Sequence, residues 1–292
     1  MIKIKVPATS ANLGVGFDVL GIALDIYNTY YVRESDKLII EGVEEKYQTK
    51  DNLFVVAFNE VCTKLNVKKN IYVRIENDIP ISRGLGSSAS LYVAGALAAN
   101  TLNNNKLNLQ EIFEICTKLE GHPDNIASAL FGGFTASLMH ENKPYTKQIK
   151  VHDKYKFTVL IPDFKISTNK ARNVLPHSYY REDVVSNMSS IAHLILALND
   201  GDDKMLSIAN NDKIHEPYRK TLIEDFDTLK NECLKNNAYT FTISGSGSSC
   251  LVISDDKDFS KKINTSNLKN NWTLIDCNIH LSTPIIEEIT DV

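Results

Sequence analysis

Residues 80–90 read Pro-Ile-Ser-Arg-Gly-Leu-Gly-Ser-Ser-Ala-Ser and run directly into an apolar segment with helical spacing. Leu91, Ala94 and Leu102 fall on one face of that segment, which predicts a helix over residues 87–102. Glycine lets a backbone approach a ligand closely, and the first N–H groups of a helix have no partner inside the helix. These groups and the helix dipole together favour a bound phosphate. We therefore predict a phosphate-binding loop, whose serine hydroxyls bind phosphate oxygens or Mg²⁺.

The same loop has two other interpretations. A glycine turn followed by a serine N-cap explains an isolated loop of this kind about equally well without any ligand. The run from Gly84 to Ala89 also fits G-x-G-x-x-A, a dinucleotide-binding pattern that requires an acidic residue about 20 positions further on. Asn103, Asn104 and Asn105 stand there instead, so we rank this pattern low. A Walker P-loop is excluded, because the chain contains no Gly-Lys-Ser or Gly-Lys-Thr.

A second polar segment, residues 119–127, reads Leu-Glu-Gly-His-Pro-Asp-Asn-Ile-Ala. Glu120 is expected at the end of one helix and Asp124 at the N-cap of the next. Two carboxylates beside His122 and Asn125 suit a magnesium ligand and a group close to a transferring phosphate. The alternative is that Asp124 only caps a helix.

Two further segments are rich in glycine. Residues 7–21, PATSANLGVGFDVLG, follow a predicted strand, and their polar character predicts a loop. Asn12 and Asp18 could hold a polar ligand, the carboxylate by pairing with an ammonium group, although a structural loop with Asx turns is commoner for such a segment alone. Residues 244–249, SGSGSS, lie between two predicted strands and suit either a flexible hairpin or a ligand clamp.

Hydrophobic periodicity predicts an α+β chain with two domains, residues 1–150 and 151–292, which meet in the polar stretch 143–156. In the first domain we expect strands at 2–6, 38–41 and 71–75, and helices at 51–65, 87–102 and 109–120. The last of these helices has a capping box, Asn108 with Glu111, and a stop at Gly121. In the second domain we expect strands at 157–161, 239–243, 250–253 and 273–280, and helices at 184–198, 203–210, 218–236 and 258–268.

Composition restricts the class of protein. The 292 residues are 43% hydrophobic and carry a net charge of −4, so neither disorder nor an electrostatic surface for nucleic acid or membranes is expected. The start of the chain has no secretory h-region, and its longest nearly apolar run, residues 89–99, is shorter than the roughly 18 residues of a membrane span. The five cysteines are odd in number and form no CxxC pair, which is typical of a reducing compartment. We predict a soluble cytoplasmic globular protein that is large enough to be an enzyme.

Five segments resemble, in their order and over almost the whole chain, those of the GHMP kinase superfamily. They are PATSANLGVGFDVLG at 7–21, ISRGLGSSAS at 81–90, EGHPDNIA at 120–127, STNKARNVLP at 167–176 and SGSGSS at 244–249. The glycine-serine loop marks the superfamily, whereas PATSANLG and EGHPDN are similar to the homoserine kinase family within it. The resemblance implies an N-terminal domain of the ribosomal-protein-S5 type, a ferredoxin-like C-terminal domain and a site in the cleft between them.

The resemblance also implies phosphorylation of L-homoserine by ATP with Mg²⁺, giving O-phospho-L-homoserine in threonine biosynthesis, by a homodimer. The ATP phosphates would be held by Arg83, Gly84, Leu85, Gly86, Ser87, Ser88, Ala89 and Ser90, and the metal by Ser88 and Glu120. Homoserine would be held by Asn12, Asp18, Arg172, Arg219 and Gly245, with His122, Asp124 and Asn125 around the acceptor hydroxyl.

The sequence departs from the family pattern at three places, and two alternative functions remain open. Relatives often have glutamate where this chain has Lys118, and proline or Pro-Thr where it has Val15 and Ser248-Ser249. The first rival is a mevalonate-type or sugar kinase. Asp18 with Arg172 and Arg219 argues against a sugar, because an acid for an amine and an arginine fork for a carboxylate suit a zwitterion. The second is a protein of this fold that only binds or senses a ligand.

Overall fold

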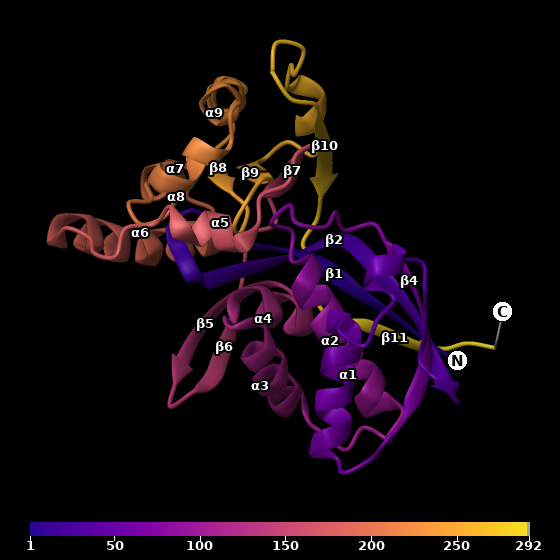
Figure 1. Cartoon of the computed structure of the whole chain (residues 1–292). Helices are drawn as coiled ribbons and strands as arrows, with labels where there is room; N and C mark the ends of the chain where they lie inside the picture. Colours follow the sequence, from indigo (N-terminus) through magenta and orange to yellow (C-terminus); the bar gives the residue numbers. More distant parts are fainter. Residues whose placement is uncertain (291–292) are drawn as a thin grey trace.

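The computed structural model describes residues 1–290, which form two α+β parts, each built on its own sheet (Figure 1). The N-terminal sheet has the strand order β11-β1-β2-β4-β3, and β5 and β6 extend it beside β2. Its pairs are antiparallel apart from β3 with β4. The strands are β1 (Ile2–Asn12), β2 (Gly16–Ser35), β3 (Ile39–Glu41), β4 (Asn70–Asn77), β5 (Phe134–His140), β6 (Lys143–Ile149) and β11 (Ile285–Glu288).

The first two strands correct the predicted loop at residues 7–21. β1 continues to Asn12, and β2 begins at Gly16, so the two form one long hairpin with a short turn. The pairing shifts register at Pro7/Ala8 and at Ala11/Asn12, which accommodates the proline and the polar residues inside a buried strand. The first half of the polar stretch 143–156, where we placed the domain boundary, forms strand β6 of the N-terminal sheet.

Four helices pack on the N-terminal sheet: α1 (Leu53–Lys64), α2 (Ser87–Thr101), α3 (Leu109–Glu120) and α4 (Asp124–Phe131). The predicted caps of α3 are confirmed. Asn108 and Glu111 form the reciprocal capping box, and Gly121 ends the helix with a φ of +94°. Gly95 of α2 has Phe54 backbone where a Cβ would stand, so α1 and α2 approach closely.

The C-terminal sheet is antiparallel in the order β10-β7-β9-β8, formed by β7 (Lys156–Pro162), β8 (Thr240–Ile243), β9 (Cys250–Ser254) and β10 (Trp272–Cys277). This order is that of a ferredoxin-like fold, and the two-domain α+β prediction is confirmed. The predicted helix at 258–268 is wrong: only a 3₁₀ turn, Phe259–Lys262, is present. Asn264 then accepts a hydrogen bond from the N–H of Ser266, which favours a turn over a helix.

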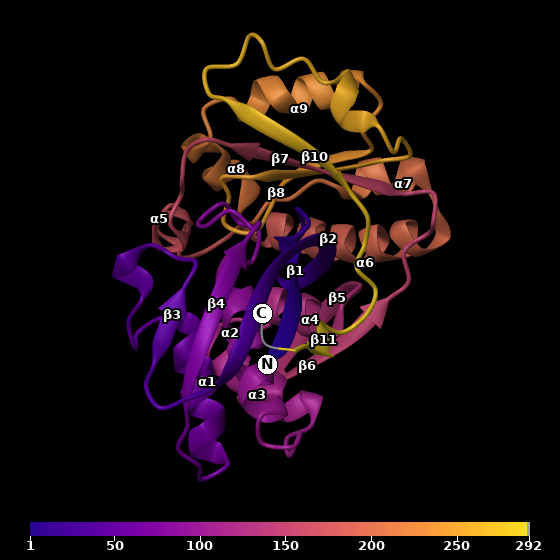
Figure 2. The ribbon, with the colours of Figure 1, turned by 90° about the vertical axis from the view of Figure 1, so that its right-hand side faces the viewer.

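Helices cover both faces of the C-terminal sheet (Figure 2). α9 (Phe226–Lys235) packs on one face, and α6 (Arg181–Asp200) and α7 (Asp203–Ala209) fill the space between the other face and the β1–β2 hairpin. The predicted helix 218–236 is interrupted, because Asp225 turns away to bind the main-chain N–H groups of residues 269 and 270 and the Trp272 indole. Before the break lie α5 (Thr168–Asn173), α8 (Glu216–Arg219) and a 3₁₀ turn, Lys220–Leu222; another, Glu45–Tyr47, precedes α1.

Two predictions from composition can be compared with the structure. All five cysteines are free and buried, as expected for small apolar fillers. Among residues 1–290, we find no helix that combines the length and the apolar character needed to cross a bilayer.

Candidate active site

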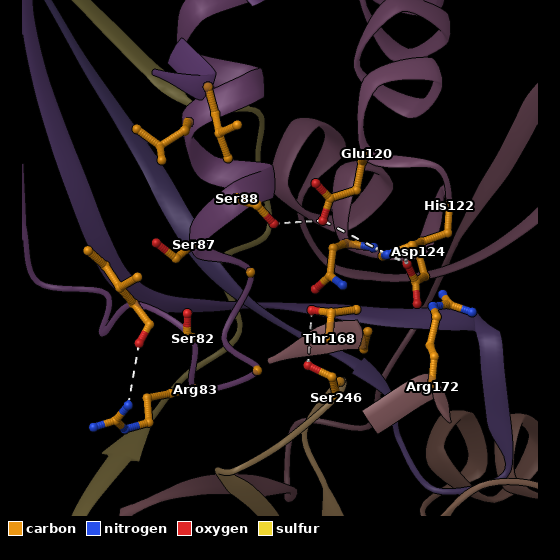
Figure 3. A pocket seen from close by; sticks show the side chains of 18 of the residues that line it. Ser82, Arg83, Ser87, Ser88, Glu120, His122, Asp124, Thr168, Arg172 and Ser246 are labelled. Carbon is orange, nitrogen blue, oxygen red and sulfur yellow. Dashed lines mark hydrogen bonds and ion pairs between the residues drawn. The ribbon is translucent and has the colours of Figure 1, made fainter. Parts of the chain in front are cut away.

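A cavity of about 430 Å³ lies between the two parts of the molecule (Figure 3). All four glycine-containing or acidic segments singled out in the sequence contribute to it, together with α5 and α8. Of the predicted site residues, the cavity is lined by Asn12, Asp18, Arg83, Gly84, Gly86, Ser87, Ser88, Glu120, His122, Asp124, Asn125, Arg172, Arg219 and Gly245. The chain thus brings together residues that are 233 positions apart in sequence, as in the bond from the Asn12 amide to the Gly245 carbonyl.

The loop before α2 exposes main-chain donors to this cavity. Gly84 and Gly86 have φ values of +74° and +68°, which only glycine adopts without strain. Gly86 is the N-cap of α2 and provides no side-chain cap, so the first N–H groups of the helix are left for a ligand. A Cβ on Gly86 would lie 1.9 Å from Thr9 Oγ1, and one on Gly84 would lie 2.1 Å from the Ser244 carbonyl oxygen. The loop therefore has to be glycine at both places.

The side chains of this loop do not all face the cavity. Ser87 and Ser88 line it, whereas Leu85, Ala89 and Ser90 are buried outside its lining. The last three residues can thus reach a ligand only through their main chain. The Ser90 hydroxyl instead pairs with Tyr30, 2.8 Å away.

Arg83 links the loop to the C-terminal sheet. Its Nε donates to the Pro162 carbonyl at 2.9 Å, and its Nη2 to the Asp163 carbonyl at 2.8 Å. Burial lowers the pKa of Arg83. These bonds use much of the guanidinium, so its main observed role is to hold the loop against the end of β7.

Ser88 and Glu120 form an oxygen pair inside the cavity (Figure 3). The Ser88 hydroxyl donates to Glu120 Oε1 at 2.7 Å. Burial is the largest influence on Glu120, and it raises the pKa of this carboxyl group. A hydroxyl and a nearly buried carboxylate are hard oxygen donors that fit Mg²⁺, which would offset the unfavourable burial of the charge. Lys118 does not disturb them, since its exposed ammonium pairs with Glu60 at 3.2 Å.

Asp124 and His122 form the second acidic contact. Their Oδ1 and Nδ1 atoms are 2.6 Å apart, and Asp124 is 1% exposed. Burial alone would lower the pKa of His122, but its hydrogen bond to Asp124 and the charges of Asp124, Glu120 and Asp18 outweigh this effect and raise it. The predicted N-cap role of Asp124 is wrong: Pro123 occupies that position, and Asp124 is the first residue of α4. Its carboxylate is thereby free to line the cavity.

The β1–β2 turn places a carboxylate opposite an arginine. Asn12 and Asp18 both have positive φ values, +73° and +55°, and the Asn12 side chain accepts the Asp18 N–H at 3.0 Å. Asp18 Oδ1 and Oδ2 accept from Arg172 Nη2 and Nη1 at 3.0 and 3.1 Å. The two charged groups that we predicted to bind opposite ends of a substrate therefore pair with each other here. One polar atom each from Asp18, His122 and Asp124 also lies within 4.8 Å of the others, an arrangement that can hold a cation.

Arg219 is the buried member of the arginine pair. It is 3% exposed, and its Nε and Nη1 donate to the Ala171 and Gly245 carbonyls at 3.1 and 3.0 Å. Burial is the largest influence on this group and lowers the pKa of Arg219 to about 10, so it remains charged at neutral pH. The guanidinium carbons of Arg219 and Arg172 lie 5.0 and 5.7 Å from the centre of the Phe17 ring. An aromatic ring thus supports both cations.

Several lining residues were missed. Thr168 and Ser246, whose hydroxyls are 3.5 Å apart in the cavity wall, lie inside two of the quoted segments, so their hydroxyls could have been chosen from the sequence. The wall next to the loop also contains polar Ser82, Asp51, Asn52 and Asn77. Its apolar part comes from separate segments with no local pattern that links them: Val43, Tyr47, Leu53, Ile81 and Leu91.

Comparisons with known proteins agree with this geometry. Residues 52–133 match the model of the GHMP kinases N terminal domain, and residues 194–264 match that of the GHMP kinases C terminal. A homoserine kinase of Clostridium botulinum (strain 657 / Type Ba4) is 44% identical over 278 residues, 93% of this chain and 94% of that protein. One from Clostridium acetobutylicum is 38% identical over 94% and 96%. The crystal structure of homoserine kinase from Cytophaga hutchinsonii superposes with a TM-score of 0.90 at 27% identity, covering 98% of this chain and 97% of the other.

Proposed function

Since the chain belongs to the homoserine kinase family of the GHMP kinases, we propose that it transfers the γ-phosphoryl group of ATP to the hydroxyl of L-homoserine. The observation that carries this proposal is the composition of the cavity. A glycine loop with free main-chain N–H groups stands beside a carboxylate and two arginines, which are the partners a small zwitterion requires.

The loop would bind the triphosphate. Gly86, Ser87 and Ser88 line the cavity, so the uncapped N–H groups at the start of α2 are available to a bound phosphate, and the helix dipole adds to the attraction. The apolar wall formed by Val43, Tyr47, Leu53 and Leu91 suits a nucleobase. Together they would place the γ-phosphate near Ser88 and Glu120.

Homoserine would replace the ion pair between Asp18 and Arg172. A zwitterion carries an ammonium for Asp18 and a carboxylate for Arg172 and Arg219, so it can separate the pair without leaving either charge uncompensated. A neutral sugar or a substrate with only one charge offers no such exchange. This balance of charge is why the site favours an amino acid over mevalonate or galactose.

In the reaction, the homoserine hydroxyl oxygen forms a bond to the γ-phosphorus, and the bond from that phosphorus to the ADP oxygen breaks. The hydroxyl proton passes to solvent water. We propose that Asp124, with His122 and Asn125 beside it, orients the hydroxyl and is not indispensable as a base. Ser88 and Glu120 would hold Mg²⁺, which neutralises charge on the phosphates when bound.

Coupled ADP release with homoserine, homoserine lactone, mevalonate and galactose, compared side by side, tests the proposal. We expect turnover with homoserine and a kcat/KM at least about 10²-fold lower with each of the others, because a wrong ligand would leave the half-buried Asp18 or the arginines without an opposite charge. Faster turnover of mevalonate or galactose would contradict the substrate. Nucleotide binding without turnover of any small alcohol would favour a sensor.

The metal site gives a separate prediction. Glu120→Gln removes the carboxylate charge and keeps an oxygen for the Ser88 hydroxyl. We expect the Mg²⁺ concentration for half-maximal activity to rise about tenfold or more, because one hard anionic ligand is lost. Glu60→Gln is the matched control, since Glu60 pairs with Lys118 outside the cavity lining. An unchanged Mg²⁺ requirement in Glu120→Gln would place the metal elsewhere.

A homodimeric assembly, a cytoplasmic location and the absence of nucleic-acid or membrane partners stay predictions of the sequence and of the family resemblance.

A further inference from the structure

One buried histidine lies directly behind the predicted homoserine site. His215 is fully buried just before α8, the short helix that carries Arg219, and it is absent from the cavity lining. None of the sequence patterns singled it out. Its position raises the question of what a buried imidazole does beside two guanidinium groups.

The His215 ring nitrogens have different surroundings. Nε2 lies 2.7 Å from the carbonyl oxygen of Gly14, in the turn between β1 and β2, and therefore donates to it. Nδ1 is buried and has no hydrogen-bond partner. Burial is the largest influence on this group and lowers the pKa of His215. A proton on Nε2 fits the bond to Gly14, and the buried Asp212 carboxylate lies 3.6 Å from the same nitrogen. Because burial outweighs this carboxylate, the ring adds no third cation beside Arg219 and Arg172.

The ring of His215 also stacks on Phe17. The two ring centres are 5.3 Å apart, with an angle of 26° between the planes. Phe17 is the same ring that supports the guanidinium groups of Arg172 and Arg219. His215 thus supports the aromatic platform on which both arginines rest.

The Gly14 contact belongs to a two-point clamp on the β1–β2 turn. Asn187 of α6 donates to the Val15 carbonyl at 2.8 Å, next to the bond from His215 to Gly14. The residues that follow the turn are Phe17 and Asp18. The imidazole therefore donates a hydrogen bond to Gly14 through Nε2 and stacks on the Phe17 ring with its face.

We propose that His215 is a positioning residue, which holds the Phe17 ring and the turn before it so that Arg172 and Arg219 meet the substrate carboxylate. The proposal rests on the proposed function of the cavity. Arginine–carboxylate contacts are charge-assisted hydrogen bonds with strict geometry, so a modest displacement of the two guanidiniums is enough to weaken homoserine binding measurably.

Two variants separate the two contacts of the ring. His215→Gln keeps a side-chain N–H for Gly14 and removes the stacked ring, and His215→Phe keeps a ring and leaves the Gly14 carbonyl unpaired. We expect His215→Gln to raise the KM for homoserine about tenfold, with kcat and the KM for ATP within about twofold of wild type. We expect His215→Phe to raise the KM for homoserine by no more than about threefold. It should lower the melting temperature more than His215→Gln does, because the buried Gly14 carbonyl is left without a hydrogen-bond donor.

Tyr218→Leu is the matched control, because Tyr218 lies on the same helix and makes an aromatic contact with Tyr179, not with Phe17. We expect its KM for homoserine to match wild type. 3-Aminopropan-1-ol, which is homoserine without its carboxylate, serves as a competitive probe. Its inhibition constant should change by less than about twofold in His215→Gln, because the displaced arginines have no carboxylate to bind.

The outcomes distinguish this inference from the function on which it rests. A wild-type enzyme with no homoserine turnover would overturn both. With an active wild type, an unchanged homoserine KM in His215→Gln, an equal rise in the KM for ATP, or an equal weakening of 3-aminopropan-1-ol would overturn the positioning role alone.

Discussion

Gly86→Ala is expected to lower kcat/KM for ATP by about 10²-fold or more, because misplacing a binding loop by 1 Å can have an effect of this size. A methyl group at this position would lie 1.9 Å from Thr9 Oγ1, and the φ of +68° is strained for alanine. Thr9 is itself hydrogen-bonded to Asn125 at 2.7 Å, so it cannot move without disturbing the acidic side of the site. The start of α2 would have to shift. Steady-state kinetics with varied ATP measures the loss.

Gly133→Ala is the control for this prediction. Gly133 also has a positive φ, +72°, but a Cβ there would meet only the Gln148 side chain, at 3.4 Å, and the residue does not line the cavity. Both variants should lose a similar amount of stability from backbone strain, about 1–2 kcal/mol. If Gly133→Ala loses as much activity with ATP as Gly86→Ala, strain alone accounts for the effect and the loop has no special role.

Asp124→Asn is expected to reduce kcat by about 10²–10⁴-fold with little change in the KM for either substrate, because the carboxylate charge acts on the hydroxyl during transfer. Asparagine still offers an oxygen to the His122 ring, which is 2.6 Å from the present carboxylate. The His122 pKa should fall, since the hydrogen bond and charge of Asp124 are the two largest influences that raise it. Kinetics and an NMR titration of His122 would measure the two effects.

The size of the loss decides the role of Asp124. A reduction in kcat beyond about 10⁴-fold with intact binding would mean that Asp124 is a true general base and that our orienting role is wrong. A reduction of less than about tenfold would remove Asp124 from the chemistry. Asp227→Asn is the control, since Asp227 is exposed and pairs only with Lys220 in the hydrogen bonds and ion pairs described.

The sequence predicted those elements whose stabilising contacts are local. The α3 helix carries its apolar face, its capping box and its glycine stop within fourteen residues, and the structure confirms all three. β2 was missed because its pairing partners, β1, β4 and β5, lie in three separate parts of the chain. The helix expected at 258–268 does not form, because side chains such as Asn264 bind neighbouring main-chain N–H groups and favour turns.

The same distinction holds for the candidate site, where features formed by one contiguous segment were predictable and features formed by distant residues were not. The phosphate loop was predictable because Gly84, Gly86 and the start of α2 are contiguous. The ion pair of Asp18 with Arg172 spans 154 positions, and no local pattern indicates it. The support of the arginines by Phe17 and His215 likewise depends on three elements that meet only in the folded chain.

Because β11 pairs with β1, the N-terminal sheet is complete only after the C-terminal part has been synthesised. Ile2 to Lys5 of β1 have their partners at residues 285–288, which the ribosome adds only after the whole C-terminal sheet. While the nascent chain is still growing, β1 therefore presents an uncovered edge, the kind of surface on which strands of other molecules can add. An amino-terminal fragment released early would keep this unpaired edge of β1. Pairing with β11 therefore protects β1 from strand addition between molecules.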